Sequence, residues 1–214
     1  MLAVIRVFTT DNPELLSLHS RLIQTRFGLE TATYCIPDQP LGIHDAASEA
    51  AAVPKIETLA RQAQVDGASA ILISCAADPA IAECRRTVSI PVIGAGSAAA
   101  ATALALGRRV GVLTLNGEPP PRMAELLGNR LTAWCSPDKV DNTTDLLTPA
   151  GLQAAFAAAN KLAEQTDVIV FACTGYTTIG LAAKLNGVIR TPVIDAVVAG
   201  GAIAAQLIPA KQGG

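Results

Sequence analysis

Short apolar runs alternate with longer amphipathic stretches through the first half of the chain. The runs are rich in branched residues, which is typical of strands. They cover residues 4–8, 31–35, 70–74 and 92–93. Between them, residues 13–26 and 47–64 place leucine, isoleucine and valine on one face of a helix. This alternation predicts an α/β fold, a doubly wound parallel sheet with helices on both faces.

The same order of elements repeats about 100 residues later, a period that predicts two copies of one α/β domain. Four pairs of segments match in order. They are Arg6-Val-Phe-Thr9 with Gly111-Val-Leu-Thr114, Tyr34-Cys35 with Trp134-Cys135, the runs ending in Cys75 and Cys173, and Pro91-Val-Ile with Pro192-Val-Ile. We therefore predict two similar lobes related by an internal repeat, with the active site in the cleft between them. The first lobe comprises 1–98 plus 200–214 and the second 99–199, and helices at 97–106 and 197–208 cross between lobes or return the chain.

Composition narrows the class of partner. Half of the residues are apolar, only 3% are aromatic, and the net charge is −2, so the chain lacks the basic footprint of a protein that binds nucleic acid or an anionic membrane. We expect a small-molecule substrate, and the apolar content favours a homo-oligomer. The start of the chain does not look like a signal peptide, and the five cysteines fit no zinc spacing. Both points favour a cytoplasmic protein with free thiols.

Two of the five cysteines occupy the position where such folds bind ligands. In a sheet of strand order 2-1-3-4, the site forms at the carboxyl ends of strands 1 and 3. Cys75 and Cys173 end the third strand of each half, and Thr9 and Thr114 end the first. Each half would thus present one thiol and one hydroxyl.

The segment after each thiol predicts the start of a helix. Asp78 before Pro79 is a strong N-cap signal, and Thr177 or Thr178 can cap the helix after the second thiol. Free amides at a helix start would lower the pKa of a nearby thiol toward neutrality and hold a carboxylate or a developing enolate. The alternative for any one cysteine is burial in the core. We assign that role to Cys35 and Cys135, and place Cys84 on the helix after Asp78.

Other motifs have competing interpretations. Residues 94–99, Gly-Ala-Gly-Ser-Ala-Ala, fit a dinucleotide fingerprint, but they follow the fourth strand rather than the first and lack the downstream acid. Small residues there more simply let a helix approach the sheet. His44 and Asp45 either border the pocket or form a turn with a helix cap. Tyr176 either closes over substrate or packs in the second lobe, and His19 is a partly buried structural residue.

These residues resemble the aspartate/glutamate/hydantoin racemase family over nearly the whole chain. The resemblance rests on Cys75 with the Asp-Pro that follows it, on Pro91-Val-Ile-Gly-Ala-Gly96, on Ala172-Cys-Thr-Gly175 and on Pro192-Val-Ile-Asp195. The hydantoin and allantoin racemase branch is the most similar. The chain differs from that branch at Thr9-Thr-Asp-Asn12, where an asparagine-rich segment is usual, and at Ser97, where glutamate is common.

The resemblance implies a cofactor-independent racemase or epimerase that needs neither a metal nor pyridoxal phosphate. One cysteine, as thiolate, removes a proton from the carbon next to a carbonyl, and the other, as thiol, returns a proton to the opposite face. The expected catalytic residues are Cys75 and Cys173. The expected substrate-binding residues are Thr9, Thr10, Ala76, Ala77, Thr114, Thr174, Gly175 and Tyr176. A hydantoin-like or amino-acid-derived substrate is the leading hypothesis. The alternatives are a racemase of free aspartate or glutamate, a related cysteine isomerase or decarboxylase, and a non-catalytic two-lobed sensor.

Overall fold

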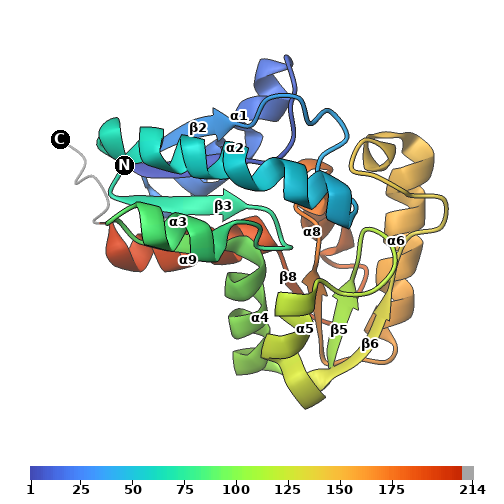
Figure 1. Ribbon diagram of the computed structural model, residues 1–214. Coiled ribbons are helices and arrows are strands. Elements are labelled where there is room, and N and C mark those ends of the chain that lie inside the picture. Colours follow the sequence, from blue (N-terminus) through green and yellow to red (C-terminus); the bar gives the residue numbers. More distant parts are fainter. Residues whose placement is uncertain (209–214) are drawn as a thin grey trace.

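The computed structural model describes residues 1–208, which form two four-stranded parallel sheets (Figure 1). The first has the order β2-β1-β3-β4, from β1 (Leu2–Arg6), β2 (Thr31–Cys35), β3 (Ala70–Ser74) and β4 (Val92–Gly94). The second has the order β6-β5-β7-β8, from β5 (Val110–Leu113), β6 (Leu131–Cys135), β7 (Val168–Phe171) and β8 (Val193–Ile194). The two sheets share the 2-1-3-4 order that the repeat predicts, so the α/β class and the two lobes are confirmed.

Helices follow nearly every strand. They are α1 (Pro13–Phe27), α2 (Ala46–Val65), α3 (Ile81–Thr87), α4 (Ala95–Leu106), α5 (Pro121–Leu127), α6 (Pro149–Ala163), α7 (Gly175–Thr178), α8 (Leu181–Leu185) and α9 (Ala196–Leu207), with short 3₁₀ turns at Gly128–Arg130 and Asp145–Leu147. Local sequence sets the ends of the long helices. Asn12 caps α1 by accepting from two backbone amides, and Gly28 ends it in a left-handed conformation. Asp45 and Ser48 form a capping box at the start of α2.

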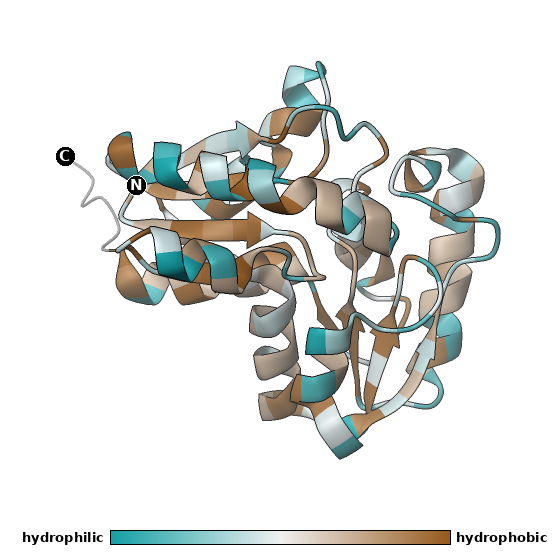
Figure 2. Ribbon diagram, viewed as in Figure 1, coloured by the Kyte–Doolittle hydropathy of each residue, from teal (hydrophilic) through white to brown (hydrophobic). Residues whose placement is uncertain are grey.

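Burial explains the runs of branched residues. Every residue of β1 and β3 is buried, and β3 is largely brown in Figure 2 while teal residues lie on the outer faces of the helices. A half-exposed strand alternates apolar and polar residues, whereas a strand covered on both faces is apolar throughout. The buried strands therefore appear in the sequence as continuous apolar runs.

Helices α4 and α9 lie where the two lobes meet (Figure 1). They pack against each other, α4 also contacts α5 and β7, and α9 also contacts α1 and β3. Neither helix contains a charged residue, and their glycines and alanines allow close approach. The expected lobe boundaries, 1–98 plus 200–214 and 99–199, stay a prediction, and residues 209–214 lie outside the described part of the chain.

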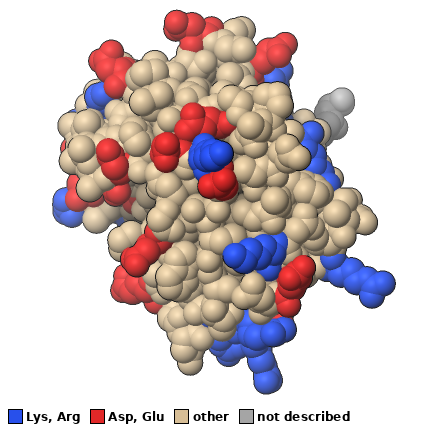
Figure 3. Space-filling model, turned by 90° about the vertical axis from the view of Figure 1, so that its right-hand side faces the viewer, with Lys and Arg blue, Asp and Glu red and all other residues tan. Residues whose placement is uncertain are grey.

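The charged surface agrees with a small-molecule partner. On the face shown in Figure 3, acidic and basic groups are scattered among broad uncharged areas, some of them side by side, and no continuous basic surface covers this face. Among residues 1–208, no helix combines the length and the apolar character that a membrane crossing requires.

Candidate active site

Two thiols from different lobes line one small cavity. Cys75 comes directly after β3 and Cys173 comes two residues after β7, and both line a cavity of ≈ 60 Å³. Both β3 and β7 pair with the first strand of their sheets, so the thiols lie at the switch point of each lobe. The strand count therefore locates the pair correctly.

Four of the predicted substrate-binding residues share this cavity with the thiols, namely Ala76, Ala77, Thr174 and Gly175. Thr114 lies on an adjoining cavity of ≈ 300 Å³ that shares several lining residues with the first. Its hydroxyl is already used, since it donates to the carbonyls of Gly117 and Cys135.

The structure does not bring Thr9, Thr10 and Tyr176 to the thiol cavity. The Thr9 hydroxyl donates to the Ile36 carbonyl at 2.6 Å, which joins it to the segment after β2. Thr10 Oγ1 accepts from the backbone amide of Asn12 within its own loop. Tyr176 is completely buried, and its hydroxyl donates to the Thr114 carbonyl at 2.6 Å. Its ring lies 5.1 Å from that of Phe171, so of its two interpretations the structure favours packing in the second lobe.

The expected helix caps are wrong. Asp78 does not cap the helix that follows it, because Asp78 and Ala80 both have positive φ and α3 begins only at Ile81. Its carboxylate instead accepts the amides of Gly96 and Ser97 at 2.7 Å, together with the Ser97 hydroxyl. Asp78 thus caps α4, which ties the Cys75 segment to the helix between the lobes.

Residues 94–99, which fit a dinucleotide fingerprint, lie at the start of α4 and form its contact with the Cys75 segment. A Cβ on Gly96 would lie 2.0 Å from the carbonyl oxygen of Ala76, the residue after the first thiol. Only glycine permits α4 to approach so closely, and the small residues are explained by packing, as predicted.

The caps expected after the second thiol also differ. Thr177 donates to the Asp195 carboxylate at 2.9 Å, and Asp195 in turn caps α9. The Thr178 hydroxyl contacts His19 at 3.0 Å. Helix α7 has only four residues and lacks a side-chain cap, so the second thiol has a few nearby amides rather than the start of a long helix.

Burial dominates the acidity of both thiols, contrary to the expected shift toward neutrality. Desolvation raises the pKa of Cys173 to about 11, although the Gly175 amide, the Thr143 side chain and the Tyr176 amide oppose it. Desolvation raises the pKa of Cys75 further, the Ala77 amide opposes the shift, and Cys173, Asp78 and Glu49 add repulsion. Removal of water outweighs the local amides, so both groups are thiols in the closed cavity.

The remaining cysteines do not line the thiol cavity, and a packing role for them stays a prediction. Cys35 and Cys135 end the outer strands β2 and β6, and their thiols donate to the carbonyls of Phe8 and Ala158. Cys84 is fully buried within α3.

Residues 20–204 match the sequence profile of the Asp/Glu/Hydantoin racemase family. The chain belongs to this family. A hydantoin racemase from Rhizobium meliloti is 28% identical over 180 residues, which cover 81% of this chain and 74% of that protein.

Solved racemase structures share the fold of this family member. The allantoin racemase from Klebsiella pneumoniae superimposes with a TM-score of 0.81 at 23% identity, covering 96% of this chain and 86% of that one. The allantoin racemase from Pseudomonas fluorescens gives a TM-score of 0.79 at 18% identity, covering 96% and 89%. A glutamate racemase from Bacillus anthracis gives 0.70 at 12% identity, covering 96% and 80%.

In this member of the racemase family, one loop from each lobe closes over the thiols. Gly42 and Ile43 from the first lobe and Thr143 and Leu147 from the second all line the thiol cavity. The Thr143 amide donates to the Leu41 carbonyl across the cleft at 3.4 Å. The sequence did not identify these residues, because their loops lack a regular pattern.

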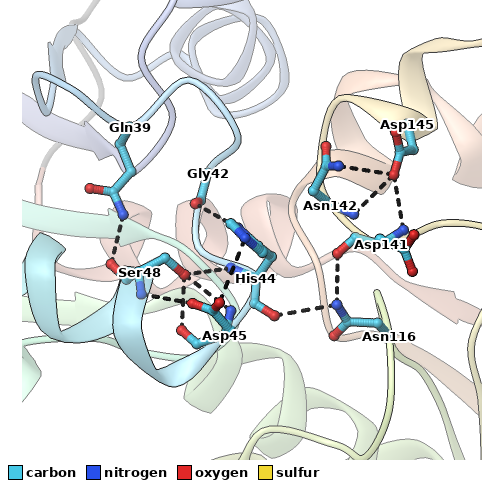
Figure 4. Close-up of polar contacts among 9 residues, drawn as sticks. All are labelled: Gln39, Gly42, His44, Asp45, Ser48, Asn116, Asp141, Asn142 and Asp145. Atoms are coloured by element: carbon cyan, nitrogen blue, oxygen red, sulfur yellow. Dashed lines mark hydrogen bonds and ion pairs between the residues drawn. The ribbon is translucent and has the colours of Figure 1, made fainter.

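Figure 4 shows how the two loops are joined at the mouth of the cleft. The Asn116 side chain donates to the carbonyl of His44 in the first lobe at 3.3 Å and to that of Asp141 in the second at 2.7 Å. Asp145 organises the second loop by accepting from the amides of Asp141 and Asn142.

We call the cavity of ≈ 300 Å³ that adjoins the thiol cavity the mouth chamber. Its lining includes His44, Asp45, Glu49, Thr114, Asn116 and Glu118. His44 and Asp45 therefore border the cleft, and Asp45 also caps α2, so both of their interpretations hold. Glu49 is half-buried, and burial raises the pKa of its carboxyl group.

Arg6 is a site residue that the sequence interpretation missed. It ends β1, lines the thiol cavity, and donates from Nη1 to the carbonyls of Leu15 and Leu16 in α1 at 2.6 and 3.1 Å. Burial lowers the pKa of its guanidinium to about 10. An isolated charge within a buried strand is a signal that the sequence does contain.

Proposed function

We propose that this chain is a cofactor-independent racemase or epimerase that uses Cys75 and Cys173 as its two bases and acts on a hydantoin-like ring. The observation that carries the proposal is that two thiols, at equivalent positions of two repeated lobes, line a single cavity. The names of the relatives, hydantoin racemase and allantoin racemases, support a ring substrate.

The proposed reaction needs one thiolate and one thiol. In one direction the Cys173 thiolate takes the proton from the α-carbon, so an S–H bond forms, the C–H bond breaks, and its electron pair moves onto the neighbouring carbonyl as an enolate. The Cys75 thiol then gives its proton to the opposite face and becomes the thiolate. In the other direction the roles exchange. Amides near the thiols, such as that of Gly175 at 3.3 Å from Cys173 Sγ, can stabilise the negative charge.

The charges around the cleft favour a neutral ring over a free dicarboxylic amino acid. Arg6 is the one lysine or arginine among the described residues that line the two cavities, and its Nη1 is held by carbonyls of α1. The mouth chamber carries Asp45, Glu49 and Glu118. The carboxylates of aspartate or glutamate would meet repulsion there, whereas a hydantoin carries no charge at that position.

Hydrogen exchange tests the reaction class. We expect the protein to exchange the α-hydrogen of a neutral 5-alkylhydantoin in D₂O and to remove its optical rotation, while free aspartate and glutamate react far more slowly. NMR and polarimetry against an enzyme-free blank give the two rates. Tight binding of hydantoins without any exchange would instead support the sensor alternative.

The thiol pKa values predict how the rate depends on pH. Because the pKa of Cys173 is raised to about 11, the thiolate fraction grows about tenfold per pH unit below that value. We expect kcat/KM, which reports the free enzyme, to rise steadily through the alkaline range. An N3-methylated hydantoin is a suitable substrate, since its imide nitrogen cannot ionise. A plateau that begins near neutral pH would contradict the raised pKa.

A further inference from the structure

His19 joins the two segments that carry the thiols. It lies on α1 and is completely buried, yet both ring nitrogens have partners. Nδ1 lies 2.8 Å from Ser74 Oγ, and Nε2 lies 3.0 Å from Thr178 Oγ1. Ser74 directly precedes Cys75, and Thr178 ends the short helix that follows Cys173. One imidazole therefore spans from the first lobe to the second.

A second hydrogen bond runs parallel to this link. The Thr174 hydroxyl donates to the Ser74 carbonyl at 3.2 Å, so the residue after Cys173 is tied to the residue before Cys75. We call His19, Ser74, Thr174 and Thr178 the interlobe bridge. The last three line the thiol cavity, which puts the bridge at the wall of the site.

The bridge holds a neutral imidazole. Burial and the nearby charge of Arg6 lower the pKa of His19 well below its usual value, against a smaller opposing contribution from a hydrogen bond to the Thr174 backbone. A neutral ring has one N–H donor and one acceptor nitrogen, and each hydroxyl can take the complementary part. Both polar contacts are thus satisfied without a buried second charge beside Arg6.

We propose that His19 is a positioning residue that fixes the distance between Cys75 and Cys173 through Ser74 and Thr178. The inference rests on the proposed two-thiol function. Inversion requires both thiols to reach opposite faces of one carbon, whereas exchange of the α-hydrogen on a single face requires only one of them. Loss of the bridge should therefore separate two reactions that the intact protein couples, because a misplacement of about 1 Å can cost about 10²-fold in rate.

The first variant is Thr178→Val, which keeps the shape of the side chain and removes the hydroxyl. We expect its rate of inversion, divided by its rate of α-hydrogen exchange, to fall at least tenfold in D₂O with a 5-alkylhydantoin. The matched control is Thr33→Val. The Thr33 hydroxyl contacts Ser20 Oγ at 2.5 Å, so it joins the same helix α1 to β2 within the first lobe. This control should leave the ratio unchanged.

Two replacements of His19 separate positioning from simple loss of stability. The amide of His19→Gln reaches the place of Nε2 and can still contact Thr178, whereas that of His19→Asn reaches only the place of Nδ1 and Ser74. We expect His19→Gln to keep more of the wild-type ratio than His19→Asn. If Thr178→Val and His19→Asn both invert with the wild-type ratio, the bridge has no positioning role. If the wild-type protein exchanges no hydantoin at all, it is the proposed function that fails.

Discussion

Replacing either thiol by serine should abolish racemisation. Cys75→Ser and Cys173→Ser each remove one of two groups that must act on opposite faces of the substrate, and a serine hydroxyl is far less acidic than a thiol. We expect the rate of inversion to fall by about 10³-fold or more in each variant. Each should retain slow α-hydrogen exchange with only one enantiomer, because the remaining thiol reaches only one face. Chiral chromatography with mass detection in D₂O follows both products at once.

Cys35→Ser and Cys135→Ser are the matched controls. Both thiols lie at the ends of outer strands and donate to backbone carbonyls, and a serine hydroxyl can make the same bond. These variants should change stability by a small amount and leave turnover close to that of the wild type. Full racemisation by Cys75→Ser or by Cys173→Ser would rule out the two-base mechanism.

Gly96→Ala should strongly destabilise the protein and disturb the first thiol. The added methyl group would lie 2.0 Å from the Ala76 carbonyl oxygen. A backbone carbonyl cannot rotate away as the end of a side chain can. Either α4 or the Cys75 segment must shift, which we expect to cost about 3 kcal/mol or more in the free energy of unfolding. For a chain of this size that corresponds to a fall in Tm on the order of 10 °C. Urea unfolding and calorimetry measure both quantities.

Gly200→Ala is the comparison for this change. Its methyl group would meet the Cδ1 atom of Leu72 at 2.5 Å, and the end of a leucine side chain can move. We expect less than half the loss of stability and little effect on turnover. Equal losses for the two variants would show that the Ala76 contact has no special importance.

The fold could be predicted because its signals are local and repeated. Strands buried on both faces appear as continuous apolar runs, and residues 70–74 coincide with the buried strand β3. The run at 31–35 coincides with the half-buried outer strand β2. The thiol pair followed from strand order, since that order alone fixes which strand ends meet at the switch point.

The rest of the site depends on contacts between distant residues. Asp78 looks like the cap of the next helix, but its positive φ turns the carboxylate toward α4, 18 residues away. His19 and Thr178 are separated by 159 residues, and no local pattern relates them. The thiol pKa values are set mainly by how completely the two lobes exclude water. Helix-cap signals in the sequence carry no information about that burial.

The unequal surroundings of the two thiols have a thermodynamic consequence. Cys75 is the more strongly desolvated of the pair and faces Glu49 and Asp78, whereas Cys173 has the Gly175 amide beside it. In the proposed two-thiol mechanism, deprotonation from the two sides therefore starts from thiolates of different stability, and we expect the maximal velocities for the two mirror-image substrates to differ. Mirror-image molecules have equal free energy in water, so any such advantage in one direction must be cancelled by an equal ratio of Michaelis constants. The asymmetry of the lobes can therefore affect how fast each enantiomer is consumed, but not which enantiomer accumulates at equilibrium.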